Sequence, residues 1–272
     1  MRGFFSHKKG SESGLGKIIS VITQKGGVGK TTTVNALCAT LSRKDYRVLA
    51  IDMDPQGNLS FSTGAETDSK PTIYELIKGD VTVKEAIQRM SMTDIVPSNI
   101  LLSGIELEYT GKNREFLLYT ALKEAQPFYD YILVDSPPGL GILTVNALTA
   151  CDYVIIPMMP DIFSLQGLTL VYETIDYVKH TINPGIEIAG VLINRYVKRS
   201  KLHKEVNGTA KMICQKLRIP LFETVIRNST ALAEAQALQM DITEYARRST
   251  GTKDFASLVA ELERYGVVKH PY

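Results

Sequence analysis

Residues 23–33 read TQKGGVGKTTT, and this stretch decides the fold. It follows an apolar run, KIISVIT, and opens a helical pattern, which is the context that a phosphate-binding loop requires. Gly26, Gly27 and Gly29 permit a tight turn that presents backbone N–H groups, and the next helix adds the positive end of its dipole. We therefore predict that this loop binds the phosphates of a nucleotide.

The polar side chains of the loop have separate predicted tasks. Lys30 should reach the β- and γ-phosphates, and the Thr31 hydroxyl should bind Mg²⁺. The alternative, a glycine-rich turn with a chance lysine, is disfavoured by the flanking strand and helix. The predicted nucleotide contacts are Lys25, Gly26, Gly27, Val28, Gly29, Lys30, Thr31 and Thr32.

Carboxylates follow two further apolar runs. Asp52 and Asp54 stand in LAIDMDPQGN, and Asp135 stands in YILVDSPPG. Because Mg²⁺ prefers oxygen ligands and keeps several waters, we expect Asp52 and Asp135 to hold it through water, beside Thr31. Asp54 lies on the same side of an extended chain as Asp52, and we expect it to position or activate the attacking water. Any one of these acids alone would fit a cap or a turn better, but together with the phosphate loop they favour the functional role.

Short apolar runs alternate with helical patterns along the chain, which predicts an α/β fold with a doubly wound, mostly parallel sheet. The predicted strands are 17–23, 47–53, 93–98, 129–136, 151–158 and 187–194. The predicted helices are 30–42, 73–78, 83–90, 113–125, 144–150, 166–180, 203–217 and 253–265. We expect one domain over 17–272, and a flexible tail over 1–16 that is too short for a DNA-reading module.

Composition limits the classes of partner. The 272 residues carry a formal net charge of only +2, so attraction to nucleic acid must come from clustered charge. The three cysteines have no metal-ligand spacing, and we expect them to be buried thiols in a reducing compartment. No run is long enough for a membrane span or resembles a signal peptide, so we expect a cytoplasmic protein.

Three motifs together, KGGVGKTTT, DMDPQGN and DSPPGLG, resemble the deviant Walker A ATPases and, within them, the ParA/Soj partition proteins. The likeness continues through IVPSNILLSGIELE and GVLINRY and covers the chain from Lys17 to about Pro220. The resemblance implies slow, Mg²⁺-dependent ATP hydrolysis, a homodimer in the ATP state, a ParB-like partner and a nucleoid-associated bacterial protein. It also implies that Lys25 crosses the dimer interface to the partner's phosphates.

Asn194, at the end of GVLIN, resembles a base-reading asparagine of related nucleotide switches. Its amide can donate to and accept from the adenine edge. A capping or turn asparagine is the alternative.

Basic residues gather late in the chain. Resembling proteins bind double-stranded DNA without sequence preference in the ATP state, and such binding needs only phosphate contacts. The predicted DNA contacts are Arg195, Lys198, Arg199, Lys201, Lys204, Arg227, Arg247 and Arg248. A solvated surface is the alternative. The segment ETVIRNSTALAEAQA departs from the family, because Ala231 stands where an ungapped comparison expects an arginine.

Other functions share the nucleotide motif. A MinD-like membrane switch would end in a basic amphipathic helix, whereas the last helical pattern, DFASLVAELERYG, carries acids and resembles a docking helix. We therefore expect no membrane partner. A nitrogenase-type reductase would need cluster cysteines, and DSPPGLG has none. A scaffold that only binds nucleotide is disfavoured by the acids, and a ParA-like positioner of a protein cargo stays open.

Overall fold

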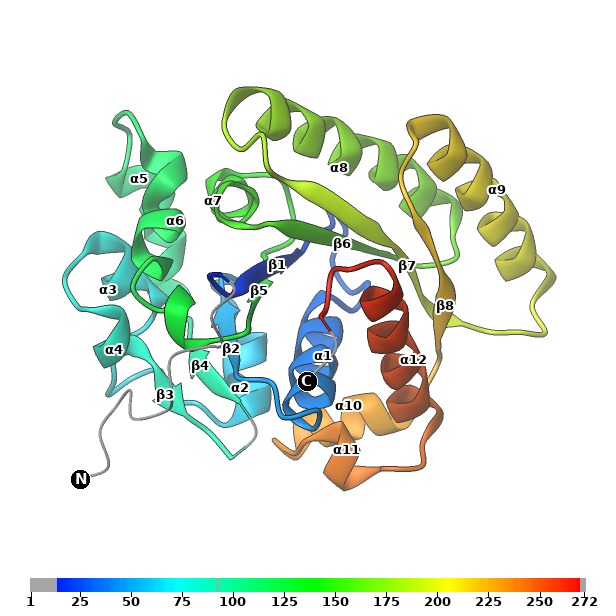
Figure 1. Cartoon of the computed structure of the whole chain (residues 1–272), viewed down its shortest axis with the longest axis horizontal. Coiled ribbons are helices and arrows are strands. Elements are labelled where there is room, and N and C mark those ends of the chain that lie inside the picture. Colours follow the sequence, from blue (N-terminus) through cyan, green and yellow to red (C-terminus); the bar gives the residue numbers. More distant parts are fainter. Residues whose placement is uncertain (1–13, 92, 270–272) are drawn as a thin grey trace.

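The computed structural model describes residues 14–91 and 93–269, which fold around one eight-stranded sheet (Figure 1). The strand order is β3-β4-β2-β5-β1-β6-β7-β8, and every pair is parallel except β3 and β4. The strands are β1 (Lys17–Val21), β2 (Val48–Asp52), β3 (Gln88–Arg89), β4 (Asp94–Val96), β5 (Tyr131–Asp135), β6 (Tyr153–Met158), β7 (Glu187–Tyr196) and β8 (Leu221–Arg227). The predicted doubly wound α/β fold is confirmed.

Helices cover both faces of the sheet (Figure 1). The α-helices are α1 (Lys30–Ser42), α2 (Asn58–Thr63), α3 (Ile73–Lys78), α4 (Val83–Ala86), α5 (Ile105–Glu108), α6 (Leu117–Leu122), α7 (Ile142–Ala150), α8 (Ile162–Thr181), α9 (Lys201–Leu217), α10 (Thr230–Ala237), α11 (Ile242–Tyr245) and α12 (Thr250–Arg264). The short 3₁₀ turns are η1 (Ile100–Gly104), η2 (Arg114–Phe116) and η3 (Gln126–Phe128).

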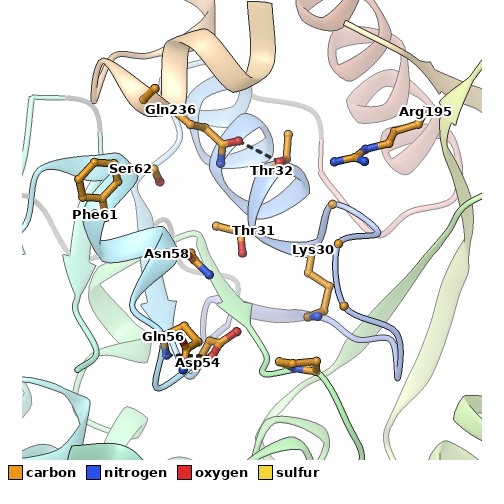
Figure 2. Close-up of a pocket in the computed structure, with 15 residues that line it drawn as sticks. Lys30, Thr31, Thr32, Asp54, Gln56, Asn58, Phe61, Ser62, Arg195 and Gln236 are labelled. Carbon is orange, nitrogen blue, oxygen red and sulfur yellow. Dashed lines mark hydrogen bonds between the residues drawn. The ribbon is translucent and has the colours of Figure 1, made fainter. Parts of the chain in front are cut away.

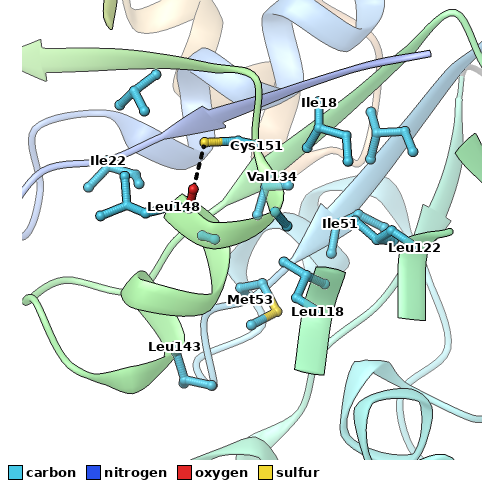
Figure 3. Packing of buried hydrophobic residues seen from close by; sticks show 14 of the residues in the cluster. Ile18, Ile22, Ile51, Met53, Leu118, Leu122, Val134, Leu143, Leu148 and Cys151 are labelled. Carbon is cyan, nitrogen blue, oxygen red and sulfur yellow. Dashed lines mark hydrogen bonds between the residues drawn. The ribbon is translucent and has the colours of Figure 1, made fainter. Parts of the chain in front are cut away.

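The sheet separates two apolar cores. Successive residues of β1 point to opposite faces, so Ile18 joins the core under α3 and α6–α9, while Ile19 joins the core under α1 and α10–α12. Figure 3 shows part of the first core, where Ile18 and Cys151 pack together with Leu148. The cysteines Cys38, Cys151 and Cys214 are buried free thiols, as predicted.

The last helix belongs to the second core. Phe255, Leu258, Val259 and Leu262 of α12 are buried, and the helix packs on β8 and α1. The predicted docking role of this helix is therefore confirmed. In the described part of the chain, no helix combines the length and the apolar character needed to cross a bilayer.

Some predicted elements differ from the structure. The helix predicted over 83–90 ends at Ala86, because the following residues pair as β3 and the Gln88 amide binds the backbone of Glu66 at 2.6 and 2.9 Å. The helix predicted over 113–125 begins as a 3₁₀ turn after Asn113, whose φ is 68°. The strand β8 and the helices α2 and α10 were not predicted as elements.

Residues 1–13 of the tail predicted over 1–16 lie outside the described part of the chain. Its last residue, Gly16, is fixed to the fold by two hydrogen bonds with Gln126, at 3.1 and 2.9 Å. A Cβ at Gly16 would lie 2.1 Å from the Tyr129 carbonyl oxygen, so only glycine fits there. The folded region thus includes Gly16.

Candidate nucleotide-binding site

A cavity of about 390 Å³ opens at the carboxyl end of the sheet (Figure 2). Its walls come from three parts of the chain: the loop before α1, the β2–α2 connection, and a late region formed by Arg195 and α10. This is the edge at which open α/β sheets bind ligands, because the strand order reverses there around β1. The position follows from the topology.

The phosphate loop adopts the backbone that its glycines allow. Gly27 and Gly29 have φ values of 73° and 98°, in the left-handed region that other residues avoid. A Cβ built on Gly26 or Gly27 would meet no atom within 4 Å, so the cavity leaves room over this turn. Lys30 opens α1 and lines the cavity, and its side chain is almost fully buried. Burial lowers the pKa of Lys30, although Asp135 and Asp54 act in the opposite direction.

Asp135 is a fully buried carboxylate with little hydrogen-bond support. Neither oxygen makes a hydrogen bond of ordinary geometry with a described residue. Burial, and then the adjacent Asp52, raise the pKa of this carboxylate well above its ordinary value, although the nearby Thr31 hydroxyl and Lys30 ammonium both lower it. An unpaired buried charge is costly, and a cation would compensate it. This orphaned carboxylate therefore fits the predicted magnesium site.

Asp52 faces Asp135 across the paired strands β2 and β5, but its oxygens are occupied. One oxygen accepts hydrogen bonds from the N–H and hydroxyl of Ser60, at 2.8 and 2.7 Å, and the other accepts from the Asp54 N–H at 3.1 Å. Burial raises the pKa of Asp52 to about 6. Asp52 thus organises the turn that carries Asp54, and its contact with metal through water stays a prediction.

Asp54 lines the cavity, as predicted for the residue that handles water. Its carboxylate accepts a hydrogen bond from the Gln56 N–H at 3.0 Å, which fixes its direction. Gln56 and Asn58 line the same wall (Figure 2). These two were not predicted as site residues, although both stand in the quoted motif DMDPQGN.

Lys25 does not line the cavity of its own chain. Its ammonium pairs with Asp161 at 2.9 Å and lies 5.8 Å from the Phe163 ring centroid. Asp161 also caps α8, because it accepts the Ser164 N–H at 2.9 Å. The predicted contact of Lys25 with a partner's phosphates would require the lysine to leave Asp161.

Asn194 lies beneath the phosphate loop. Its amide donates to the Val28 carbonyl at 3.0 Å and to the Thr33 hydroxyl at 3.3 Å. A Cβ at Gly29 would lie 2.9 Å from the same amide nitrogen, so the loop and Asn194 pack closely. Its buried carbonyl oxygen has no partner among the described residues. Asn194 therefore supports the loop, and adenine recognition stays a prediction.

Arg195 lines the cavity, whereas the sequence suggested a place on a DNA surface. Its φ of 53° is uncommon for a side chain of this size. Figure 2 shows the guanidinium extending toward the start of α1. Sequence reasoning grouped Arg195 with its basic neighbours and could not detect that the backbone turn separates it from them.

The other predicted DNA contacts lie outside the cavity. Lys198, Arg199, Lys201 and Lys204 are exposed at the end of β7 and the start of α9, and Arg247 and Arg248 are exposed after α11. Arg227 differs, because its guanidinium binds Asp254 of α12 at 2.6 and 3.0 Å. Its ion pair links β8 to α12, and a DNA contact by Arg227 stays a prediction.

Two more helices complete the cavity. Phe61 and Ser62 of α2 and Gln236 and Ala237 of α10 line it, and none was predicted. Their pattern carries no nucleotide motif, so only the tertiary structure brings them here. In residues 14–91 and 93–269, no three His, Cys, Asp or Glu side chains are grouped to hold a metal.

Comparison with known proteins gives consistent results. The AAA domain family matches residues 16–188. The chromosome partitioning protein ParA of Myxococcus xanthus is 35% identical over 99% of this chain and 96% of its own length. The sporulation initiation inhibitor protein Soj of Bacillus subtilis is 37% identical over 93% of this chain and 100% of its own. Among solved structures, cobyrinic acid a,c-diamide synthase from Mycobacterium smegmatis, with bound ATP analog and magnesium, has a TM-score of 0.82, 30% identity, and coverage of 92% of this chain and 95% of that one.

The Asp161 carboxylate has two roles that substitutions can separate. Asp161→Asn keeps a good cap for α8 but loses the charge, so we expect the free energy of unfolding to fall by less than about 1 kcal/mol. Asp161→Ala loses both, and we expect a fall of about 1–2 kcal/mol. Urea unfolding measures both values. Equal losses of stability in the two variants would show that the ion pair between Asp161 and Lys25, and not the helix cap, carries the stabilisation.

Arg195 should contribute to nucleotide affinity. We expect Arg195→Ala to weaken ADP binding roughly tenfold, because a charge-assisted contact is lost. Arg199→Ala is the matched control, since Arg199 is exposed and does not line the cavity. Titration calorimetry with ADP makes the comparison, and equal affinities for wild type and Arg195→Ala would remove Arg195 from the site.

Proposed function

Because the chain belongs to the AAA domain family and, within it, to the ParA/Soj partition ATPases, we propose that it is an ATP-dependent dimerisation switch. In this proposal it hydrolyses ATP slowly, binds DNA without sequence preference, and segregates plasmid or chromosome DNA with a ParB-like partner. The observation that carries the proposal is one cavity shared by the phosphate loop and Asp54, with the orphaned Asp135 beside it.

The residues of the cavity fit ATP with Mg²⁺. The loop glycines leave open space in which backbone N–H groups would bind the phosphates. Lys30 would add positive charge next to the phosphates. Thr31 and Asp135 would hold Mg²⁺, together with waters, and the metal would neutralise charge on the phosphates. Asp54, held by the Gln56 N–H, would orient a water toward the terminal phosphate.

Dimerisation would depend on Lys25. In the single chain the ammonium is bound to Asp161. A nucleotide in a second copy would offer several negative charges in place of one carboxylate, and only while its phosphates complete the contact would the dimer be favoured. Hydrolysis would remove that preference.

The exposed basic residues support a DNA surface. Residues 198–204 contain four cations, and two copies in a dimer would double this footprint. DNA affinity would then follow the ATP-dependent dimer, and the protein would be associated with the nucleoid. A ParB-like protein would stimulate hydrolysis and release. A MinD-like membrane switch loses support, because the apolar face of α12 packs on β8 and α1 instead of facing a membrane.

Binding to random-sequence duplex DNA tests the switch. We expect binding with ATP and Mg²⁺ but not with ADP or without nucleotide, and a steep loss of affinity as salt rises. Lys25→Ala is the matched variant, which should bind nucleotide yet neither dimerise in size-exclusion chromatography nor retain DNA. If the wild-type protein forms dimers with ATP but does not bind DNA at low salt, the DNA function is excluded and a protein cargo is favoured.

Asp54 should act in turnover and not in binding. We expect Asp54→Ala to bind ATP, dimerise and stay on DNA, while its steady-state ATPase rate falls about a hundredfold, because the water loses its base or anchor. Phosphate release measures the rate, with Asp45→Ala as a surface-loop control. A rate within twofold of wild type would show that a residue other than Asp54 positions the attacking water.

A further inference from the structure

A hydrogen bond joins the phosphate loop helix to a late helix inside the cavity (Figure 2). The hydroxyl of Thr32 in α1 donates to the side-chain carbonyl oxygen of Gln236 in α10, at 2.9 Å. The two residues are 204 positions apart and both line the cavity. Gln236 has no other side-chain hydrogen bond in the described part of the chain.

The bond and a bound nucleotide compete for one proton. A hydroxyl has a single donor proton, and Thr32 gives it to Gln236. Thr32 lies in the first turn of α1, where free backbone N–H groups of a helix favour binding of an anion. A phosphate oxygen is charged and therefore a stronger acceptor than a neutral amide. A nucleotide that recruits the Thr32 proton therefore takes it from the Gln236 carbonyl oxygen.

The release would reach beyond α10. On the same helix, Glu234 accepts a hydrogen bond from the Tyr245 hydroxyl of α11 at 2.9 Å. Arg247 and Arg248 follow directly after α11 and are exposed. α10 also contacts α1, α2 and α11, so it lies between the nucleotide cavity and this basic pair.

We propose that Gln236 is a positioning residue that senses nucleotide: it holds α10 against α1 in the empty site and releases α10 and α11 when the Thr32 hydroxyl turns to a phosphate. The inference rests on the proposed function, because it requires a nucleotide in this cavity. It adds a route by which occupancy of the site changes the surface that carries Arg247 and Arg248. The differential contact is the Thr32 hydroxyl, which has a different acceptor in each state.

Hydrogen exchange with and without ADP and Mg²⁺ tests the route on the full chain. In wild type, ADP should speed amide exchange in α10 and α11 about two- to tenfold, the equilibrium value of one hydrogen bond. In Gln236→Ala the exchange should be fast without nucleotide and unchanged by ADP, and ADP should bind about two- to tenfold more tightly because its competitor is gone. Equal or slower exchange of wild-type α10 with ADP would overturn the proposal.

Two controls separate the steps. Gln239→Ala removes the same side chain three positions later, where it faces Gly64 and not the cavity, and this variant should behave like wild type. Tyr245→Phe removes the Glu234 contact and should leave the response of α10 while abolishing that of α11. A nucleotide response in Gln236→Ala equal to that of wild type would sink the inference.

The same samples separate the role of Gln236 from the proposed ATPase function. Calorimetry that detects ADP binding, with no change in α10 exchange, would overturn the role of Gln236 and leave the ATPase function intact. Absence of ADP and ATP binding by wild type would overturn the proposed function itself.

Discussion

An uncompensated carboxylate at the end of β5 governs the chemistry of this fold. Asp135 is enclosed, makes no hydrogen bond of ordinary geometry with a described residue, and stands beside Asp52 in register, with the Thr31 hydroxyl nearby. Two buried acids side by side raise each other's free energy of ionisation, and a bound cation would offset that cost. Against the effect of burial, the positive charge of Lys30 lowers the pKa of Asp135, while burial lowers the pKa of Lys30 itself. The buried carboxylates therefore favour a bound cation, and the buried ammonium of Lys30 favours a bound phosphate.

The two acids at the strand ends have become unequal through their surroundings. Asp52 is satisfied by Ser60 and by the backbone of Asp54, so it shapes the turn. Asp135 has no comparable set of hydrogen bonds. Two neighbouring residues of identical chemistry thus have different surroundings, and only Asp135 keeps the character predicted for a metal-binding acid. Hydrogen-bond donors, and not position in the motif, decide between the roles.

The polar contacts around the cavity connect regions that are remote in sequence. Asn194 supports the loop carbonyl of Val28, Gln236 binds Thr32, and Asp161 holds Lys25. Two of these contacts use a group that another partner could engage, the Thr32 hydroxyl and the Lys25 ammonium, whereas the Asn194 amide is buried beneath the loop. Of the three, only the Thr32–Gln236 bond lies between two residues that line the cavity, and the other two hold the phosphate loop and its first lysine from outside it.

The sequence by itself determined the α/β class, the strand runs around β1, and the place of Lys30, Thr31 and Asp54 in one cavity, because local periodicity and a contiguous glycine motif carry that information. Only the tertiary structure decided that Gln88 belongs to an edge strand, that Arg227 pairs with Asp254, and that Arg195 faces the nucleotide cavity. These outcomes depend on partners far along the chain and on a backbone turn at positive φ. A one-dimensional pattern cannot encode them, since the same basic or polar residue fits a solvated surface equally well until the fold brings its partner to it.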